Sequence, residues 1–208
     1  MKNTNNINSL KSLLTLTVLV IANFASATTY TAINSGKWSD AATWENGTPG
    51  NVINADDVVI IKNHITMNTD VAVNGTLTIE KGVSVMSNKS LHIATGGKLV
   101  NNGNLTVKRI LNEGTISNNA MIESMNDLEN KGSINNDQNM MAGTNLLNFG
   151  GNMTGNKGTY FANGNVISST DAKFGNSVKI YSNPDQTTAS ISTETAVAYN
   201  YGETAKKN

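Results

Sequence analysis

The chain has 208 residues and contains no cysteine. Disulfides are therefore excluded, and so is a lipid anchor attached through an N-terminal cysteine. An exported chain of this composition must rely on packing and on backbone hydrogen bonds for its stability. Arginine is nearly missing as well, since Arg109 is its single occurrence, and this scarcity weakens any phosphate-binding interpretation.

Net charge is equally small. The chain carries 15 basic and 15 acidic side chains, and removal of residues 1–27 would leave 13 and 15, because Lys2 and Lys11 lie in that segment and no acid does. The resulting net charge of about −2 provides no electrostatic footprint for nucleic acid or for an anionic membrane surface. No apolar run after residue 27 approaches a membrane-spanning length, so no membrane span is expected in the mature chain.

The segment 1–27 has the three parts of a signal peptide. Lys2 and Lys11 supply positive charge, residues 13–21 form a short apolar run, and Ala25-Ser26-Ala27 is a small-residue cleavage site. The sequence therefore predicts export, with a mature chain of residues 28–208 located outside the cell, on its surface or in a periplasm. That length suits one domain.

Asparagine and glycine are abundant, and a cassette built on them recurs. Four glycines follow one another at a nearly constant step: Gly97, Gly114, Gly132 and Gly150. An aliphatic residue stands four positions before each of them: Ile93, Ile110, Leu128 and Leu146. A small polar residue stands two positions before each: Thr95, Asn112, Asn130 and Asn148. Apolar residues follow the first three glycines by two and by eight positions, whereas Asn152 and Gly158 follow the fourth.

This period predicts an all-β fold, a single-stranded parallel β-helix (β-solenoid) with about 18 residues per coil, in which each coil buries its apolar side chains by stacking on its neighbours. The expected coils are 53–70, 71–92, 93–109, 110–127, 128–145 and one from 146, followed by one or two irregular coils. Val71, Leu77 and Val83 are expected to lie under Ile93, Leu99 and Leu105. About seven coils at the ~4.8 Å strand spacing predict a rod on the order of 30 Å long.

The domain organisation follows from the same pattern. Residues 1–27 are the signal peptide, 28–57 an N-terminal cap that contains Trp38 and Trp44, 58–182 the parallel β-helix, and 183–208 a C-terminal tail or cap. An open solenoid end has to be covered against edge pairing, which is the expected role of the two tryptophans. At the other end, residues 196–201 are either a last strand or a loose terminus.

Residues 35–100 carry a family resemblance. Trp38-Ser39-Asp40, Thr43-Trp44, Gly47, Pro49, the strand after Asp57 and the stretch from Val73 to Ile79 together resemble the start of the eight-glycine domain, found in secreted and cell-surface proteins. The resemblance implies an extracellular right-handed parallel β-helix, and the general chirality of β-crossovers predicts the same hand. It implies no activity for any residue.

Stacking of equivalent positions predicts specific side-chain contacts. Asn112, Asn130 and Asn148 are expected to form a ladder of side-chain amides. Two opposite-charge pairs are expected between successive coils, Glu113 with Lys131 and Arg109 with Asp127.

The residue types that usually form metal sites are poorly placed. The separation between His64 and His92 does not correspond to one coil, so they are not expected to stack or to share a metal. Asp56 and Asp57 are candidates for calcium, but no Gly-Gly-x-Gly-x-Asp repeat occurs, so a turn-capping role before Val58 is favoured. No metal and no cofactor is expected.

Catalysis is also not expected, and no catalytic residue is assigned. Glycoside hydrolysis needs two facing carboxylates, and the acids of the repeat are Glu113, Glu123, Asp127, Glu129 and Asp137. Two of them have predicted basic partners, and Glu123 and Asp137 have no acid one or two coils away. Arg109 beside Lys108 is too small a basic cluster for a polysaccharide lyase.

Two functional hypotheses remain. The first is an exported, non-enzymatic adhesin or cell-surface structural and binding module, whose partners are glycans, other surface proteins or, end to end, further copies of itself. The alternative is a polysaccharide-active (hydrolase- or lyase-like) or carbohydrate-binding module, with Tyr160, Phe161 or Tyr181 as platforms for sugars. The competing interpretation of these aromatics is that they fill the core of the later coils. The ligand-binding residues are unknown from sequence.

Overall fold

A computed structural model describes residues 26–182, 187–188 and 191–193. The predicted signal peptide (1–27) lies almost entirely outside these residues, as does the segment 196–201 expected either to close the C-terminal end or to be loose. The described chain is built from short strands, with a single 3₁₀ turn, η1 (Ala41–Thr43), as its helical element.

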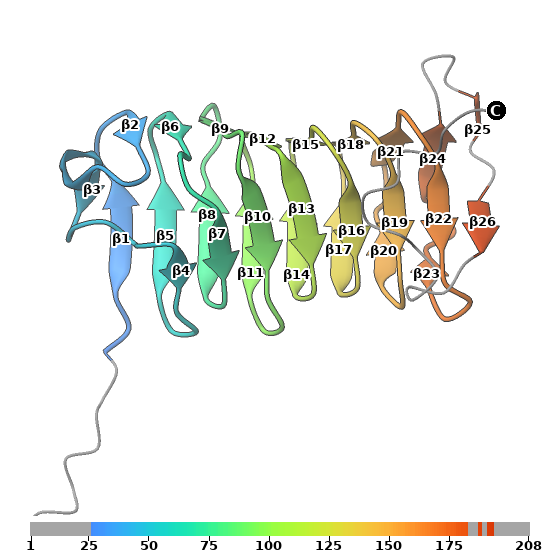
Figure 1. The fold of residues 1–208 in the computed structure, drawn as a ribbon, viewed down its shortest axis with the longest axis horizontal. Helices are drawn as coiled ribbons and strands as arrows, with labels where there is room; N and C mark the ends of the chain where they lie inside the picture. The colour runs from blue at the N-terminus through green and yellow to red at the C-terminus, as the bar shows by residue number, and fades with distance from the viewer. Residues whose placement is uncertain (1–25, 183–186, 189–190, 194–208) are drawn as a thin grey trace, which may run out of the picture.

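The strands form three sheets that run the length of a rod (Figure 1). Sheet 1 contains, in spatial order, β4 (Val52–Ile53), β7 (Val71–Val73), β10 (Ser90–Ile93), β13 (Arg109–Asn112), β16 (Leu128–Asn130), β19 (Leu146–Asn148), β22 (Val166–Ser168) and β26 (Ile191–Thr193). Sheet 2 contains β3 (Trp44–Glu45), β1 (Thr29–Ala32), β5 (Val58–Ile61), β8 (Thr76–Ile79), β11 (Lys98–Asn101), β14 (Thr115–Asn118), β17 (Ser133–Asn136), β20 (Asn152–Thr154) and β23 (Lys173–Phe174). Sheet 3 contains β2 (Gly36–Lys37), β6 (Ile65–Thr66), β9 (Ser84–Met86), β12 (Asn104–Val107), β15 (Met121–Ser124), β18 (Asn139–Ala142), β21 (Thr159–Ala162), β24 (Lys179–Ser182) and β25 (Thr187–Thr188).

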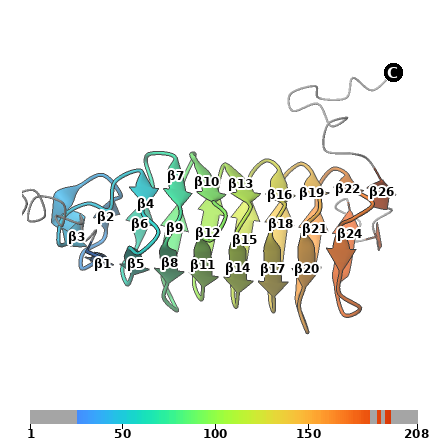
Figure 2. The ribbon, with the colours of Figure 1, turned by 90° about the horizontal axis from the view of Figure 1, so that it is seen from below.

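Each coil takes one strand from each sheet, and strands of successive coils pair in parallel, so the predicted parallel β-helix is confirmed. Seven complete coils, from β4–β6 to β22–β24, agree with the predicted number. Figure 2, turned by 90°, shows the strands of all coils in the same stacked order. The pairing is antiparallel only at the rims, where β3 joins β1 and β25 joins β24.

Alternation of inward and outward side chains along most strands builds the core. In β8, Leu77 and Ile79 point inward and are buried, while Thr76 and Thr78 are half-buried on the outside. Residues at the same position of successive coils stack directly, as Leu77 does on Leu99 and Leu99 on Ile116. Removing each such side chain from water contributes about 1.5–3 kcal/mol, and the chain of stacks makes one continuous core.

The coil length varies more than the sequence predicts. The predicted period holds from Ile110 to Leu128 and from Leu128 to Leu146. Elsewhere the corners differ in length, so the coil that separates Leu77 from its partner Leu99 is longer than the coil that separates Leu99 from Ile116.

Three predicted stacks are wrong for this reason. Val71 and Ile110 both pair with Leu91, not with Ile93. Four residues separate β10 from β11 and only two separate β13 from β14, so counting back from the glycine misaligns this corner by two positions. Leu105 likewise pairs with Val85 rather than Val83.

The fourth cassette is displaced by an extra residue. Asn152 donates its backbone N–H to the carbonyl of Gly132, and Lys173 donates to that of Gly151, so Gly151, not Gly150, is the equivalent glycine. Gly150 is the added residue, with φ of +76°. The shift places Met153 rather than Asn152 under the sheet 2 stack, and one further residue between β20 and β21 places Tyr160 rather than Gly158 under that of sheet 3.

The predicted asparagine ladder is present in the core. The Nδ2 of Asn112 donates to Oδ1 of Asn130 at 2.7 Å, and the Nδ2 of Asn130 donates to Oδ1 of Asn148 at 2.9 Å. All three side chains are fully buried at the corner between sheets 1 and 2. Buried amides of this kind are tolerable only when paired, and stacking at strand spacing pairs them.

A second ladder, not predicted from the sequence, lies at the corner between sheets 2 and 3. The Nδ2 of Asn101 donates to Oδ1 of Asn118, and the Nδ2 of Asn118 donates to Oδ1 of Asn136, each at 2.8 Å. The available signal was an asparagine four positions after each of Gly97, Gly114 and Gly132.

Each ladder begins with one unpaired acceptor. The Oδ1 atoms of Asn101 and Asn112 are buried and have no hydrogen-bond partner. Their neighbours in the preceding coil are Ile79 and Ile93, which offer no donor. The core thus changes at these two positions from aliphatic corners to amide corners.

Trp38 and Trp44 are both buried at the N-terminal end of the described chain. Their rings meet edge to face, with centroids 5.0 Å apart and planes inclined by 75°. The indole Nε1 of Trp44 donates to the carbonyl of Trp38 at 2.8 Å, and that of Trp38 donates to the carbonyl of Gly50 at 2.7 Å. Edge-to-face packing and satisfied indoles allow both rings to be buried.

The repeat glycines are required by close approach of backbones and not by an unusual φ. A Cβ on Gly132 would overlap the carbonyl oxygen of Gly114, and a Cβ on Gly114 would overlap that of Gly97. Any side chain at these corners would push successive coils apart.

We expect Asn130→Ala to destabilise the protein by about 2–4 kcal/mol, because it leaves Asn148 Oδ1 buried and unpaired and opens a cavity. Asn112→Ala is the matched control. It also leaves one buried acceptor unpaired, but it removes another acceptor that is already unpaired, so its destabilising effect is expected to be smaller. Denaturant unfolding of both variants measures the difference, and equal losses would contradict the ladder account.

We expect Gly132→Ala to destabilise by more than about 3 kcal/mol or to prevent folding, because the added methyl meets backbone that cannot move away. Gly82 has φ of +78° and open space around its Cα. Gly82→Ala, with strain but no clash, is expected to cost about 1 kcal/mol. Thermal melts of the two variants show whether close backbone contact or backbone conformation is the reason that the corners need glycine.

Candidate binding face

The outer side of sheet 3 carries an unusual row of residues. One outward side chain from each coil aligns along the rod in the order Thr66, Met86, Thr106, Glu123, Met141, Phe161 and Tyr181. We call these seven residues the sheet 3 row. Met86 is 62% exposed, and Met121 and Met125 beside the row are 37% and 40% exposed. This face therefore presents thioethers and aromatic rings where outward positions are usually polar.

The row ends in a stacked aromatic pair. The rings of Phe161 and Tyr181 have centroids 5.6 Å apart and planes inclined by 25°. Tyr160 points the other way into the core, where its hydroxyl donates to the carbonyl of Thr154 at 2.9 Å and burial raises its pKa. Tyr160 therefore fills the core, whereas the half-buried Phe161 and Tyr181 lie on the outer side of sheet 3, as strand alternation requires of adjacent residues 160 and 161.

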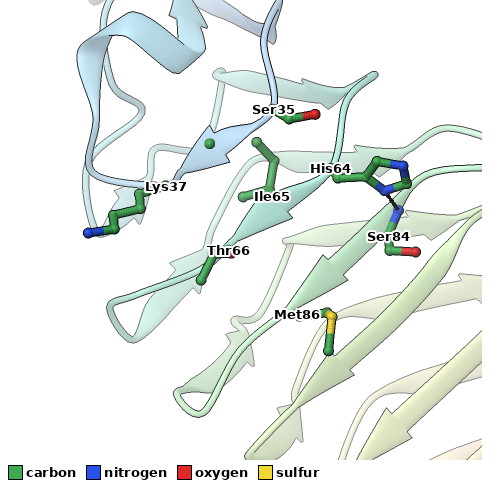
Figure 3. A pocket seen from close by; sticks show the side chains of 8 residues that line it. Ser35, Lys37, His64, Ile65, Thr66, Ser84 and Met86 are labelled. Atoms are coloured by element: carbon green, nitrogen blue, oxygen red, sulfur yellow. Dashed lines mark hydrogen bonds between the residues drawn. The ribbon is translucent and has the colours of Figure 1, made fainter.

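A hollow of about 610 Å³ opens at the N-terminal end of this face (Figure 3). It lies where cap strand β2 meets β6 and β9, and its lining includes Ser35, Lys37, His64, Thr66 and Met86. The backbone N–H of Ser84 donates to Nδ1 of His64 at 3.0 Å, which fixes the orientation of the ring. A second hollow of about 590 Å³ adjoins the first and shares Thr66 and Met86 with it.

The two histidines lie in different parts of the coil, so they do not stack. His64 is exposed beside β6, and His92 points outward from β10 with its Nε2 2.9 Å from Glu113. Within the described residues, no group of three or more histidine, aspartate or glutamate side chains is arranged to hold a metal ion.

The ion pairs beside sheet 1 differ from the two that the sequence predicts. Glu113 contacts His92 rather than Lys131, and Arg109 contacts Glu129 rather than Asp127. The two oxygens of Glu129, whose side chain is 1% exposed, lie 2.6 Å from Arg109 and 2.9 Å from Lys131. Long side chains reach diagonally across strands, which a stacking rule does not capture.

Two of the three remaining acids of the repeat, Asp127 and Asp137, bind local backbone groups. Asp127 Oδ1 accepts from the Thr144 hydroxyl at 2.5 Å and from the backbone of Asn145 at 3.1 Å. Asp137 accepts from the backbone N–H of Asn156 at 3.1 Å. Glu123 lies in the sheet 3 row, 3.4 Å from the Thr106 hydroxyl.

Asp57 has the capping role that its position in the sequence favours. Its Oδ1 accepts from the backbone N–H of Thr28 at 2.9 Å, and its Oδ2 accepts from Asn54 at 2.8 Å. The Thr28 bond, followed by the bonds from Asn54, holds the pKa of this buried carboxyl below its ordinary value of 3.8 against the opposing effect of burial.

Because this pKa is lowered by folding, the carboxylate contributes stability above about pH 3.8 that is lost as the pH falls through the lowered pKa. Asp57→Asn is therefore expected to be less stable than the parent at neutral pH, with a difference that shrinks below pH 3.8. Asp56→Asn, at the exposed neighbouring position, is the control. If thermal melts over a pH series gave the same stability difference between Asp57→Asn and the parent at every pH, this role would be contradicted.

No described helix is long and apolar enough to cross a membrane. A scan against models of protein families finds no match to the chain, and searches of curated proteins and of solved structures find no similar one.

Proposed function

We propose that the chain is an exported, non-enzymatic β-solenoid that acts as an adhesin or cell-surface binding module, with the outer side of sheet 3 as its binding face. The observation that carries the proposal is the sheet 3 row, with its exposed Met86, the exposed Met121 and Met125 beside it, and the stacked pair Phe161–Tyr181. Exposed apolar side chains gathered on one face are typical of a surface that receives a ligand or partner.

The chemistry of the row suits glycans. Sugars present apolar C–H faces and many hydroxyls, and aromatic rings beside threonines offer partners for both. Methionine thioethers adapt their shape to irregular apolar surfaces. The two adjoining hollows supply concave sites at one end of the same face.

Export rests on the signal-peptide pattern of residues 1–27. The resemblance of residues 35–100 to the eight-glycine domain family points to the same extracellular setting. End-to-end association is the weaker variant. Among the described residues, sheet 2 ends at β23, an edge of two residues that carries Lys173, and short, charged edges resist pairing.

A polysaccharide-active module is the alternative, and one observation favours it. Glu123 lies within the sheet 3 row, so a glycan bound there would pass a carboxylate. A single acid supports neither two-carboxylate mechanism of glycoside hydrolysis, and we therefore place binding first.

We expect the purified protein to retain glycans in an array and in polysaccharide pull-downs without releasing reducing ends or unsaturated products. Phe161→Ala is expected to weaken binding by about tenfold, because an aromatic contact contributes roughly 1.5 kcal/mol at most. Val100→Ala, at a half-buried outward position of sheet 2, is the matched control. Unchanged binding by Phe161→Ala would contradict the proposed face, and product release would favour the alternative.

A further inference from the structure

The cleavage site predicted from the sequence lies directly beside a hydrogen bond in the folded chain. Cleavage after Ala27 makes Thr28 the first residue of the mature chain. The nitrogen of Thr28 is the atom that donates to Oδ1 of Asp57 at 2.9 Å. We propose that Asp57 is a receiving site for the new N-terminal ammonium group, so that removal of residues 1–27 locks the first strand onto the solenoid. This inference rests on the export proposed above.

The chemistry of cleavage changes the donor. Hydrolysis of the Ala27–Thr28 peptide bond by a signal peptidase consumes one water: the C–N bond breaks, the carbonyl carbon of Ala27 takes the oxygen, and the Thr28 nitrogen takes protons to become an ammonium. A neutral N–H facing a carboxylate is thereby replaced by a positive group with three donors. Hydrogen bonds between charged partners are about twice as strong as neutral ones.

The carboxylate of Asp57 is held in place before the ammonium appears. Asp57 is 7% exposed, Asn54 binds its second oxygen at 2.8 Å, and its backbone N–H donates to the Asn54 carbonyl at 3.0 Å. Its own carbonyl accepts from Thr76 of the next coil. The acceptor is therefore fixed, and pairing requires little further ordering.

The cleavage site itself is accessible. Ser26 and Ala27 are exposed and lie outside any strand, and β1 begins at Thr29. Just after the cut, the carbonyl of Thr28 accepts from Val58 at 2.9 Å, and β1 pairs in parallel with β5. An ion pair at residue 28 would thus hold the start of the strand that carries the cap.

The test compares the stability of two forms of the chain, each with and without a substitution at Asp57. One form keeps residues 1–27 by expression without export, and the other is exported and processed, with its first residue identified by N-terminal sequencing. We expect the processed form to begin at Thr28 and to have a roughly tenfold lower unfolding equilibrium constant than the unprocessed form. Asp57→Asn is expected to abolish that difference, and Asp56→Asn to preserve it.

Each result decides between the alternatives. A processed chain that begins elsewhere than Thr28 would overturn the inference, while leaving binding by sheet 3 intact. A stability gain that survives Asp57→Asn would show that removing the leader, and not the ion pair, stabilises the fold, and would overturn it as well. Failure of the chain to be exported at all would remove both the inference and the proposed location.

Discussion

Everything in this solenoid depends on vertical stacking: each inward side chain lies directly under its equivalent in the next coil, one strand spacing away. Aliphatic stacks along the strands meet that constraint by close packing. At the corners it is met by two devices, glycines that let successive backbones touch and asparagines whose amides pair along the rod axis. Both fail if coils separate, so corner spacing and core packing support each other.

The same constraint explains how far the sequence could predict the fold. The cassette predicts the parallel β-helix, the number of coils and the Asn112–Asn130–Asn148 ladder, because short corners keep the period constant in that stretch. It fails at Ile93 and at Gly150, where longer corners change the count. Corner length depends on the path of the backbone, and the hydrophobic period of the sequence does not predict it.

The residues of the proposed binding face were only partly predictable. Alternation alone places Tyr160 inward and Phe161 outward once the bounds of β21 are known, but without those bounds the sequence leaves the aromatics as one group. The hollow beside His64 arises where β2 of the cap meets β6 and β9, which requires knowledge of how the cap folds back. The exchanged pairs of Glu113 and Glu129 depend on rotamers, which no repeat pattern specifies.

The one-way direction of the two ladders affects how such a protein can grow. Every amide donates forward along the chain, so each ladder leaves a single unpaired acceptor at its first member, whatever its length. Duplicating an internal coil that carries both asparagines would add one donor and one acceptor to each ladder and create no new orphan atom. Duplicating coils that carry both asparagines would therefore lengthen this rod without adding an unpaired polar atom. An interruption of either ladder would instead create a new unpaired acceptor.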